Sequence, residues 1–394
     1  MNAILSTRTK QIEPSATLAI SDLAHELENQ GRDIISLSAG EPDFDTPDFI
    51  KQSAIQAIYE GFTKYTNVDG TSDLKAAIAH KLKRDNQLDY ELNEIIVSNG
   101  AKQSIYNAFM AILNSGDEAI IPAPYWVSYP PMAEMAEAKP VIIQTKITKN
   151  FKIIPEQLSK AITEKTRLLI LNSPSNPSGI AYSKNELKAL ADVLLQHPQI
   201  LVLSDDIYEY ILWGQNRFVN IVNVCPELQE RTIVVNGVSK AYAMTGWRIG
   251  YAAASKSIVQ AMKKIQSQST SSPNSIAQVA ATSALGHEHQ DFNYMYEAYK
   301  SRHDFVLSTL NKMEGIHYIP ADGTFYLFPN VSATIQRLGL KSDIELSTYL
   351  LDKINVAVVP GSAFGFKGYI RLSYATSMEK LIKAMDRLAT VFDQ

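Results

Sequence analysis

Lys240 and Arg248 lie eight residues apart in a stretch of small and apolar residues that follows the apolar run Thr232–Val235. Partial burial lowers the pKa of a lysine and makes its amine a nucleophile for carbonyl groups. An arginine keeps its charge and can bind a phosphate or a carboxylate through two hydrogen bonds. The pair is therefore a candidate for carbonyl chemistry on an anionic ligand, although a lone lysine is more often simply solvated.

The turn Ser98–Lys102 has the composition of a phosphate-binding turn. It follows the apolar run Ile95–Val97 and leads into a helical pattern. Small residues at Gly100 and Ala101 let backbone N–H groups approach a ligand, and the helix dipole favours an anion there. Alone this signal is weak, because small residues are common where strands turn into helices.

Two further apolar runs, Leu168–Leu171 and Ile200–Leu203, also end in polar residues. Prolines stiffen the turn after the first run and give Asn176 a defined direction. The second run is followed by Asp205, whose carboxylate needs a cationic or N–H partner at a buried strand end. The alternative is that Asp205 or its neighbour Asp206 caps a helix.

The elements that must position these residues alternate along the middle of the chain. Helical patterns, notably Lys184–Leu195, separate apolar runs of strand length, and this alternation predicts an α/β fold with a mostly parallel sheet covered on both faces. Ligands of such sheets bind beyond the carboxyl ends of the strands. The predicted strands are Ile95–Val97, Ala119–Ile121, Val141–Ile143, Leu168–Leu171, Leu201–Leu203, Thr232–Val235 and Ile249–Ala253.

The 394 residues exceed the roughly 250–300 that one hydrophobic core serves, so we expect two domains. A large domain should span residues 46–290 and a smaller α/β domain residues 291–394. The N-terminal segment 1–45 should pack with the small domain, because chain termini often lie close together. His287–Leu310 has helical spacing and should bridge the domains. The strands predicted for the small domain are Phe325–Phe328, Val356–Val359 and Tyr369–Ser373.

The composition excludes several classes of protein. The 37 basic and 41 acidic residues give a net charge of −4, which offers no general grip on nucleic acid or an anionic membrane. The single cysteine, Cys225, excludes an internal disulfide and a cysteine-rich metal site, and we expect no metal. No apolar run has the length of a membrane span or secretory signal. We therefore expect a cytoplasmic protein.

In chain order, these segments resemble the fold-type I aminotransferases that depend on pyridoxal 5′-phosphate (PLP), and most closely the bacterial aspartate aminotransferases of class I. The resemblance runs nearly end to end. It implies a large domain with a seven-stranded, mostly parallel sheet, a small domain built from both termini, and a homodimer with shared active sites. The segments that carry it are Pro14–Thr17, Ser38–Pro47, Lys64-Tyr65, Pro124–Val127, Asn172–Gly179, Ser204–Tyr208, Ser239–Gly250 and Ile370–Tyr374.

The resemblance assigns the catalytic roles. It makes Lys240 the lysine that forms a Schiff base with PLP and moves the proton between the substrate Cα and the cofactor. Asp205 is expected to keep the pyridine nitrogen protonated, while Asp206 is structural. Tyr208 and Asn176 are expected to bond the phenolic oxygen of PLP, which lowers the pKa of the Schiff base. The chemistry belongs to the cofactor, which the protein orients and tunes.

Other cofactor contacts follow from the same resemblance. Trp126 is expected to stack on the pyridine ring, and Tyr65 to reach the phosphate from the neighbouring subunit. The family often has a serine three residues before the lysine, where this chain has Gly237, so Ser239 is the remaining candidate there. The further residues expected to hold the cofactor are Gly100, Ala101, Lys102 and Arg248.

For the substrate, the resemblance implies that Arg371 binds the α-carboxylate with two hydrogen bonds. The backbone of Gly40 and the side chains of Asn176 and Trp126 should lie beside it. Lys102 is the candidate for the distal carboxylate of an acidic substrate.

The N-terminal segment bears on specificity. Ser15 and Thr17 either add hydroxyl contacts to the substrate or are solvated, and the two interpretations have equal weight. Relatives that also accept prephenate tend to carry a lysine just before the Pro-Ser-Ala-Thr string, whereas this chain has Glu13, which repels a second carboxylate. We therefore predict ping-pong transfer from L-aspartate to 2-oxoglutarate, rather than to prephenate.

Three alternatives stay open. An aminotransferase of other specificity (glutamate, aspartate with prephenate, aromatic or broad) or a PLP-dependent lyase has the same fold, but Lys102 and Trp126 favour an acidic substrate. A PLP-sensing transcription regulator would carry an N-terminal DNA-binding domain, and here the enzyme-like motifs begin by residue 14. A dehydrogenase would show G-x-G-x-x-G after its first strand, which this sequence lacks.

Overall fold

The structure is a computed structural model that describes residues 5–6, 9–10, 12, 16–214 and 218–393. Its centre is a seven-stranded sheet in which all strands except β8 run in one direction. In spatial order the strands are β2 (Ile95–Ser98), β8 (Gly250–Ala253), β7 (Thr232–Gly237), β6 (Leu201–Asp205), β5 (Thr166–Asn172), β3 (Glu118–Ala123) and β4 (Lys139–Gln144). Each predicted apolar run overlaps one of these strands, so the predicted α/β sheet is confirmed.

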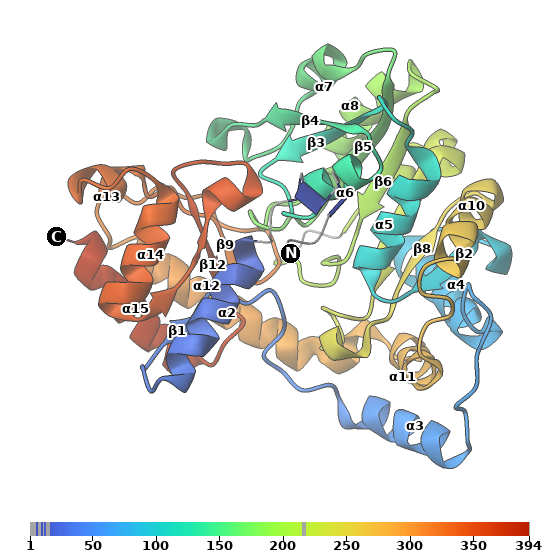
Figure 1. Ribbon diagram of the computed structural model, residues 1–394, viewed down its shortest axis with the longest axis horizontal. Helices are drawn as coiled ribbons and strands as arrows, with labels where there is room; N and C mark the ends of the chain where they lie inside the picture. Colours follow the sequence, from blue (N-terminus) through green and yellow to red (C-terminus); the bar gives the residue numbers. More distant parts are fainter. Residues whose placement is uncertain (1–4, 7–8, 11, 13–15, 215–217, 394) are drawn as a thin grey trace.

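Helices cover both faces of this sheet (Figure 1). Neighbouring strand residues point to opposite faces, so Leu168 belongs to one buried cluster and Leu169 to the other. Because both faces are covered, the strands are almost continuously apolar. One face carries α5 (Ala101–Ile112), α6 (Tyr129–Met135) and α10 (Lys256–Ser267), and the other carries α4 (Ser72–Asn86), α8 (Lys184–Leu195) and α11 (Ser275–Gly286).

The helix predicted over Lys184–Leu195 is confirmed as α8, and its start shows why the sequence marks it so clearly. The Ser183 hydroxyl accepts a hydrogen bond from the backbone N–H of Glu186, whose carboxylate in turn accepts one from the backbone N–H of Ser183. This reciprocal capping satisfies N–H groups that the first turn of a helix leaves without partners.

Segments from the two ends of the chain lie side by side next to the large sheet (Figure 1). The strand β1 (Ile35–Ser36) pairs in parallel with β10 (Val356–Ala357), and α2 (Ala16–Asn29) packs against β10. An antiparallel sheet contains β11 (Val359–Pro360), β12 (Ile370–Ser373) and β9 (Tyr326–Leu327). The helices of this region are α13 (Ser332–Arg337), α14 (Asp343–Ile354) and α15 (Met378–Phe392). The division of the chain at residues 45 and 290 stays a prediction.

Two predicted elements differ in the structure. The single strand predicted over Val356–Val359 is wrong, because Val358 separates β10 from β11 and these belong to different sheets. All of these residues are buried, so their apolar character does not mark the break. The segment His287–Leu310 begins with a short 3₁₀ turn (His289–Phe292) before the helix α12 (Asn293–Leu310), which reaches α15 (Figure 1).

The helix α3 (Asp48–Tyr59) lies at the edge of the molecule, beside α11 (Figure 1). It and the segment after it expose a row of large apolar side chains. These are Ile55, Ile58, Tyr59, Phe62 and Tyr65. Two further α-helices, α7 (Pro155–Ala161) and α9 (Ile221–Val224), are short.

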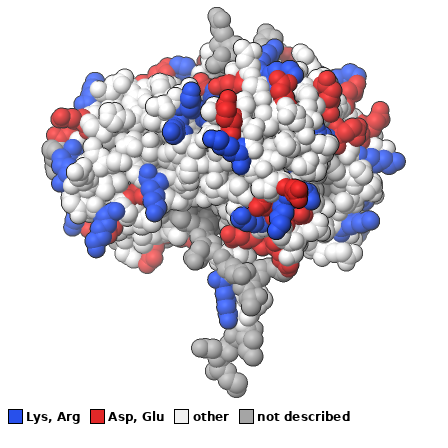
Figure 2. All heavy atoms as spheres, turned by 90° about the horizontal axis from the view of Figure 1, so that it is seen from above, with Lys and Arg blue, Asp and Glu red and all other residues white. Residues whose placement is uncertain are grey.

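On the face shown in Figure 2, basic and acidic side chains are interspersed rather than gathered by sign. Among the described residues, no helix combines the length and the apolar character that crossing a membrane requires.

Candidate functional site

The polar residues that follow the strands meet in one cavity beyond the carboxyl ends of β5, β6 and β7, at the start of α5. The sheet therefore positions them as the sequence predicts. The predicted residues that line this cavity are Gly40, Ala101, Lys102, Trp126, Asn176, Asp205, Tyr208, Ser239, Lys240, Arg248 and Arg371.

The amine of Lys240 is the group in this cavity best suited to attack a carbonyl. It donates a hydrogen bond of 2.5 Å to the carbonyl oxygen of Gly40. The pKa of Lys240 is lowered to about 8, mainly by burial; Glu41 and Asp205 oppose this lowering, and the charges of Arg371 and Arg248 add to it. At this pKa a neutral, nucleophilic amine is populated near physiological pH.

The carboxylate of Asp205 lies at the end of β6 and has only neutral hydrogen-bond partners among the described residues. The Tyr129 hydroxyl donates to its Oδ2 at 2.6 Å, and the backbone N–H of Ile207 donates to its Oδ1 at 3.3 Å. Burial raises the pKa of Asp205 to about 6. Above that pH a negative charge lies on the cavity wall, and a cationic or N–H group of a ligand would stabilise it.

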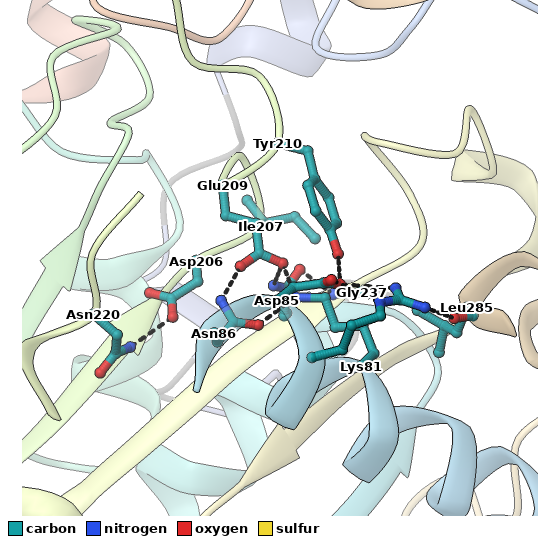
Figure 3. Close-up of polar contacts among 12 residues, drawn as sticks. Lys81, Asp85, Asn86, Asp206, Ile207, Glu209, Tyr210, Asn220, Gly237 and Leu285 are labelled. Atoms are coloured by element: carbon teal, nitrogen blue, oxygen red, sulfur yellow. Dashed lines mark hydrogen bonds and ion pairs between the residues drawn. The ribbon is translucent and has the colours of Figure 1, made fainter. Parts of the chain in front are cut away.

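The neighbouring Asp206 does not line the cavity, and its carboxylate points toward Asn220 (Figure 3). It is buried and accepts hydrogen bonds from the Ser204 hydroxyl at 2.7 Å and from the Asn220 amide at 2.6 Å. Burial also raises its pKa well above the ordinary value.

Arg371 is a buried cation that lacks a carboxylate partner among the described residues. Its guanidinium donates to Asn176 Oδ1 at 3.0 Å and to the carbonyl oxygen of Ser38 at 2.6 Å. Its Nε is buried without any hydrogen-bond partner. A buried donor of this kind costs free energy unless a ligand accepts from it, and a carboxylate fits a guanidinium best.

The start of α5 forms an anion-binding cradle with Arg248. A Cβ atom at Gly100 would lie 2.3 Å from Arg248 Nη2, and one at Gly250 would lie 2.1 Å from the backbone nitrogen of Ala101. Both glycines therefore let the backbone and the guanidinium approach closely. The described partners of Arg248 are the carbonyl oxygens of Thr245 and Asn99. With the N–H groups of the helix N-terminus, its charge suits a phosphate.

Lys102 and Trp126 lie together on the cavity wall. The ammonium nitrogen of Lys102 lies 5.0 Å from the centre of the Trp126 ring. Burial, and then the charge of Arg248, lowers the pKa of Lys102. The Trp126 ring meets Tyr129 edge to face at 5.2 Å, and the Tyr129 hydroxyl in turn donates to Asp205.

Some predicted residues are not brought into this cavity. Gly100 lies behind its lining, against Arg248. Tyr65 is 94% exposed and does not line the cavity. Ser15 and Glu13 lie outside the described residues, as does the side chain of Thr17, so their roles stay predictions.

Sequence reasoning missed two tyrosines of the site. Tyr326 lines the cavity, and its hydroxyl lies 2.9 Å from that of Tyr208. Tyr129 supports Asp205 from α6. Neither follows a predicted strand of the large sheet. The sequence did place Tyr326 in the predicted strand Phe325–Phe328. That strand belongs to the same region as Arg371, and this was the available indication that Tyr326 lies near the site.

A buried polar cluster surrounds Glu209, the residue after Tyr208, and includes side chains of α4 (Figure 3). Its carboxylate accepts hydrogen bonds from Lys81 and Asn86 of α4 and from the Asn236 amide at the end of β7, the last at 2.8 Å. Lys81 also donates to Asn86 at 2.6 Å. Glu209 directly follows Tyr208, so the cluster anchors both the β6 loop and the β7 loop that leads to the reactive lysine.

The chain is similar to known proteins over nearly its whole length. Residues 32–388 match the family described as aminotransferase class I and II. The chain is 54% identical over 393 residues to the aspartate/prephenate aminotransferase of Nitrosomonas europaea, which covers 98% of this chain and 99% of that protein. It is 45% identical over 389 residues to the aspartate aminotransferase of Rhizobium meliloti, with 98% and 95% covered. A solved structure of Thermus thermophilus aspartate aminotransferase with maleate superimposes with a TM-score of 0.94 at 41% identity, covering 99% of this chain and 100% of that one.

Proposed function

The chain belongs to the class I and II aminotransferase family, and on that premise we propose that it is an aspartate aminotransferase that transfers the amino group of L-aspartate to 2-oxoglutarate with PLP. The observation that carries the proposal is the charge of the cavity. Among the described residues, four cations line it against two carboxylates, so it suits a ligand set of high negative charge. The cations are Lys102, Lys240, Arg248 and Arg371, and the carboxylates are Glu41 and Asp205.

The described residues fit PLP. The cradle of Gly100, Ala101 and Arg248 suits its phosphate, and the carboxylate of Asp205 suits its protonated ring nitrogen. Lys240 lies in the same cavity with an amine that can bond to an aldehyde. When bound, PLP supplies the electron sink that stabilises negative charge at the substrate Cα.

The protein's own groups supply orientation and proton transfer. Lys240, as a free amine with a pKa of about 8, can accept the Cα proton and give it back, because that pKa lies near the working pH. Asp205 stays ionised above about pH 6 and so would hold a proton on the ring nitrogen of bound PLP. Tyr208 and Asn176 would supply hydrogen bonds to its phenolic oxygen, and Trp126 would stack on its ring. Ser239 is a further candidate for the phosphate.

Substrate recognition rests on two cations. Arg371 takes the α-carboxylate, since its Nε has no other acceptor, with the Gly40 backbone beside it. Lys102 takes the distal carboxylate, which an apolar amino acid lacks. Prephenate is a second candidate acceptor, because the relative from Nitrosomonas europaea carries both substrates in its name. The expectation from Glu13 that prephenate is disfavoured stays a prediction.

The proposed enzyme is a cytoplasmic homodimer. The exposed apolar row from Ile55 to Tyr65 supports a dimer, because a second copy of the chain would remove it from water. Tyr65 would then be available to the phosphate of the neighbouring site. The buried free thiol of Cys225 is consistent with a reducing compartment.

A panel of amino donors and acceptors tests the proposal. The PLP-loaded protein is mixed with each amino acid, and the absorbance of the cofactor is followed; acceptors are then added to regenerate the original spectrum. Aspartate with 2-oxoglutarate should give the highest kcat/KM. A protein that prefers aromatic or branched donors would refute the assignment, and regeneration by prephenate would extend it.

A further inference from the structure

Tyr326 is fully buried, and it contacts two residues of the proposed site. Its hydroxyl lies 2.9 Å from the hydroxyl of Tyr208, and the two rings meet edge to face at 5.8 Å. The guanidinium carbon of Arg371 lies 4.3 Å from the centre of the Tyr326 ring. One side chain therefore joins the residue assigned to the phenolic oxygen of the cofactor to the residue assigned to the α-carboxylate.

The position of Tyr326 is fixed from both sides. The pairing of β9 with β12 sets it opposite Ser373, two residues beyond Arg371. Its backbone N–H donates to the Thr324 hydroxyl at 3.1 Å, and the N–H of Thr324 donates to the carbonyl oxygen of Ile211 at 2.7 Å. Ile211 lies three residues after Tyr208, so the segments that carry the two tyrosines are joined by a backbone hydrogen bond as well as by their hydroxyl groups.

A count of hydrogens gives the direction of the hydrogen bond between the hydroxyl groups of Tyr208 and Tyr326. Each hydroxyl has one hydrogen. Among the described residues, the hydroxyl groups of Tyr208 and Tyr326 form a hydrogen bond only with each other. One hydrogen is used inside the pair, and the other is left for a ligand. If Tyr208 donates to the phenolic oxygen of PLP, its oxygen must accept from Tyr326.

We propose that Tyr326 is a positioning residue that acts through Tyr208. By donating to the Tyr208 oxygen, it orients the Tyr208 hydroxyl and strengthens that group as a donor, because successive hydrogen bonds polarise one another. The proposal rests on the proposed function, which assigns the phenolic oxygen of PLP to Tyr208.

The test is a pH titration of the PLP-loaded protein, followed by the absorbance of the lysine-bound cofactor. A donor to the phenolic oxygen stabilises the negative charge on it and lowers the pH midpoint of the spectral change. Tyr326→Phe removes one hydroxyl with almost no change of shape, so it should raise the midpoint by about half a pH unit. Tyr208→Phe should raise it further.

A double-mutant cycle shows whether the effect passes through Tyr208. In the Tyr208→Phe background, Tyr326→Phe should add no further shift, since the hydroxyl on which it acts is gone. Tyr90→Phe is the matched control. Tyr90 is also buried, its hydroxyl has no hydrogen-bond partner among the described residues, and it does not line the cavity, so the midpoint should not move.

Several outcomes would overturn the proposal. An unchanged midpoint in Tyr326→Phe refutes it, as does an equal shift in both backgrounds, or a higher KM for aspartate with no spectral shift. If Tyr326→Phe does not fold, Tyr326→Met, which also lacks a hydroxyl, should give a shift in the same direction. A wild-type protein that takes up no PLP would refute the proposed function and this inference with it. If the wild type binds PLP and shows the pH-dependent spectral change, a failure of the Tyr326 variants refutes this inference alone.

Discussion

The ammonium nitrogen of Lys240 lies 2.5 Å from the carbonyl oxygen of Gly40, although 200 residues separate the two in the chain. The segment after β1 therefore lies directly against the reactive amine. Because the carbonyl oxygen is uncharged, this contact does not neutralise the charge of the Lys240 ammonium. It holds the amine at a defined place in the cavity.

Replacing Lys240 with alanine should lower kcat by about 10⁴-fold or more, because both the covalent link to PLP and the proton-transfer group are lost. Lys240→Arg should be equally inactive, since it keeps the charge without a free amine. Borohydride reduction of the PLP-loaded wild type, followed by peptide mass mapping, should place the label on residue 240. A label on another lysine would contradict the assignment.

The uptake of PLP by the cofactor-free protein should depend on pH through the amine of Lys240. Its pKa is lowered from 10.5 to about 8 by burial, so the neutral nucleophile becomes the major form above about pH 8. The bimolecular rate should rise about tenfold per pH unit below that value and level off above it. Stopped-flow absorbance measures this rate, and a profile still rising at pH 10 would show that the amine is not buried as described.

Lys102→Met should reduce kcat/KM for aspartate by about 10–100-fold, the usual value of a hydrogen bond to a charged group. Methionine keeps the apolar stem against Trp126 and removes only the charge. For alanine or another apolar donor, the loss should be no more than about threefold. The measurement is kcat/KM for both donors with the wild type and the variant. Equal losses for the two donors would mean that Lys102 contacts the cofactor rather than the distal carboxylate.

Glu209→Gln should lower the free energy of unfolding by about 3–5 kcal/mol, because it leaves the buried ammonium of Lys81 without its carboxylate. The double variant Lys81→Met with Glu209→Gln removes both charges and should recover most of this loss. Urea unfolding monitored by circular dichroism compares the three proteins. A double variant less stable than Glu209→Gln would contradict this account of the cluster in Figure 3.

Ile58→Asp should weaken the proposed homodimer, because it places a charge in the exposed apolar row beside Tyr59. The matched control is Ile344→Asp on α14, which replaces an equally exposed isoleucine on a different part of the molecule. Analytical ultracentrifugation should show more monomer for the first variant and wild-type behaviour for the second. Monomeric wild-type protein would refute the dimer.

The sequence predicts the central sheet well for a physical reason. Strands covered on both faces must be apolar along their whole length, and runs such as Leu168–Leu171 show this directly. The residues after those strands, including Asp205 and Lys240, then fall at one edge by topology alone. Their roles came from the resemblance, because spacing by itself leaves a helix cap or a solvated lysine equally open.

Contacts that depend on tertiary pairing could not be predicted from the sequence. Tyr326 meets Tyr208 only because β9, a strand of two residues, pairs with β12 in one register. Tyr129 meets Asp205 from a helix whose orientation no local pattern fixes. The break at Val358 was hidden for the same reason, since a buried chain crossing from one sheet to another stays apolar throughout.

The late position of Arg371 orders events during protein synthesis. The residues proposed to hold the cofactor, from Ala101 to Arg248, precede the strand β12 that carries Arg371 by more than a hundred residues. They are therefore synthesised before the residue proposed to bind the α-carboxylate. A chain that ended before β12 would keep the first group and lose the second.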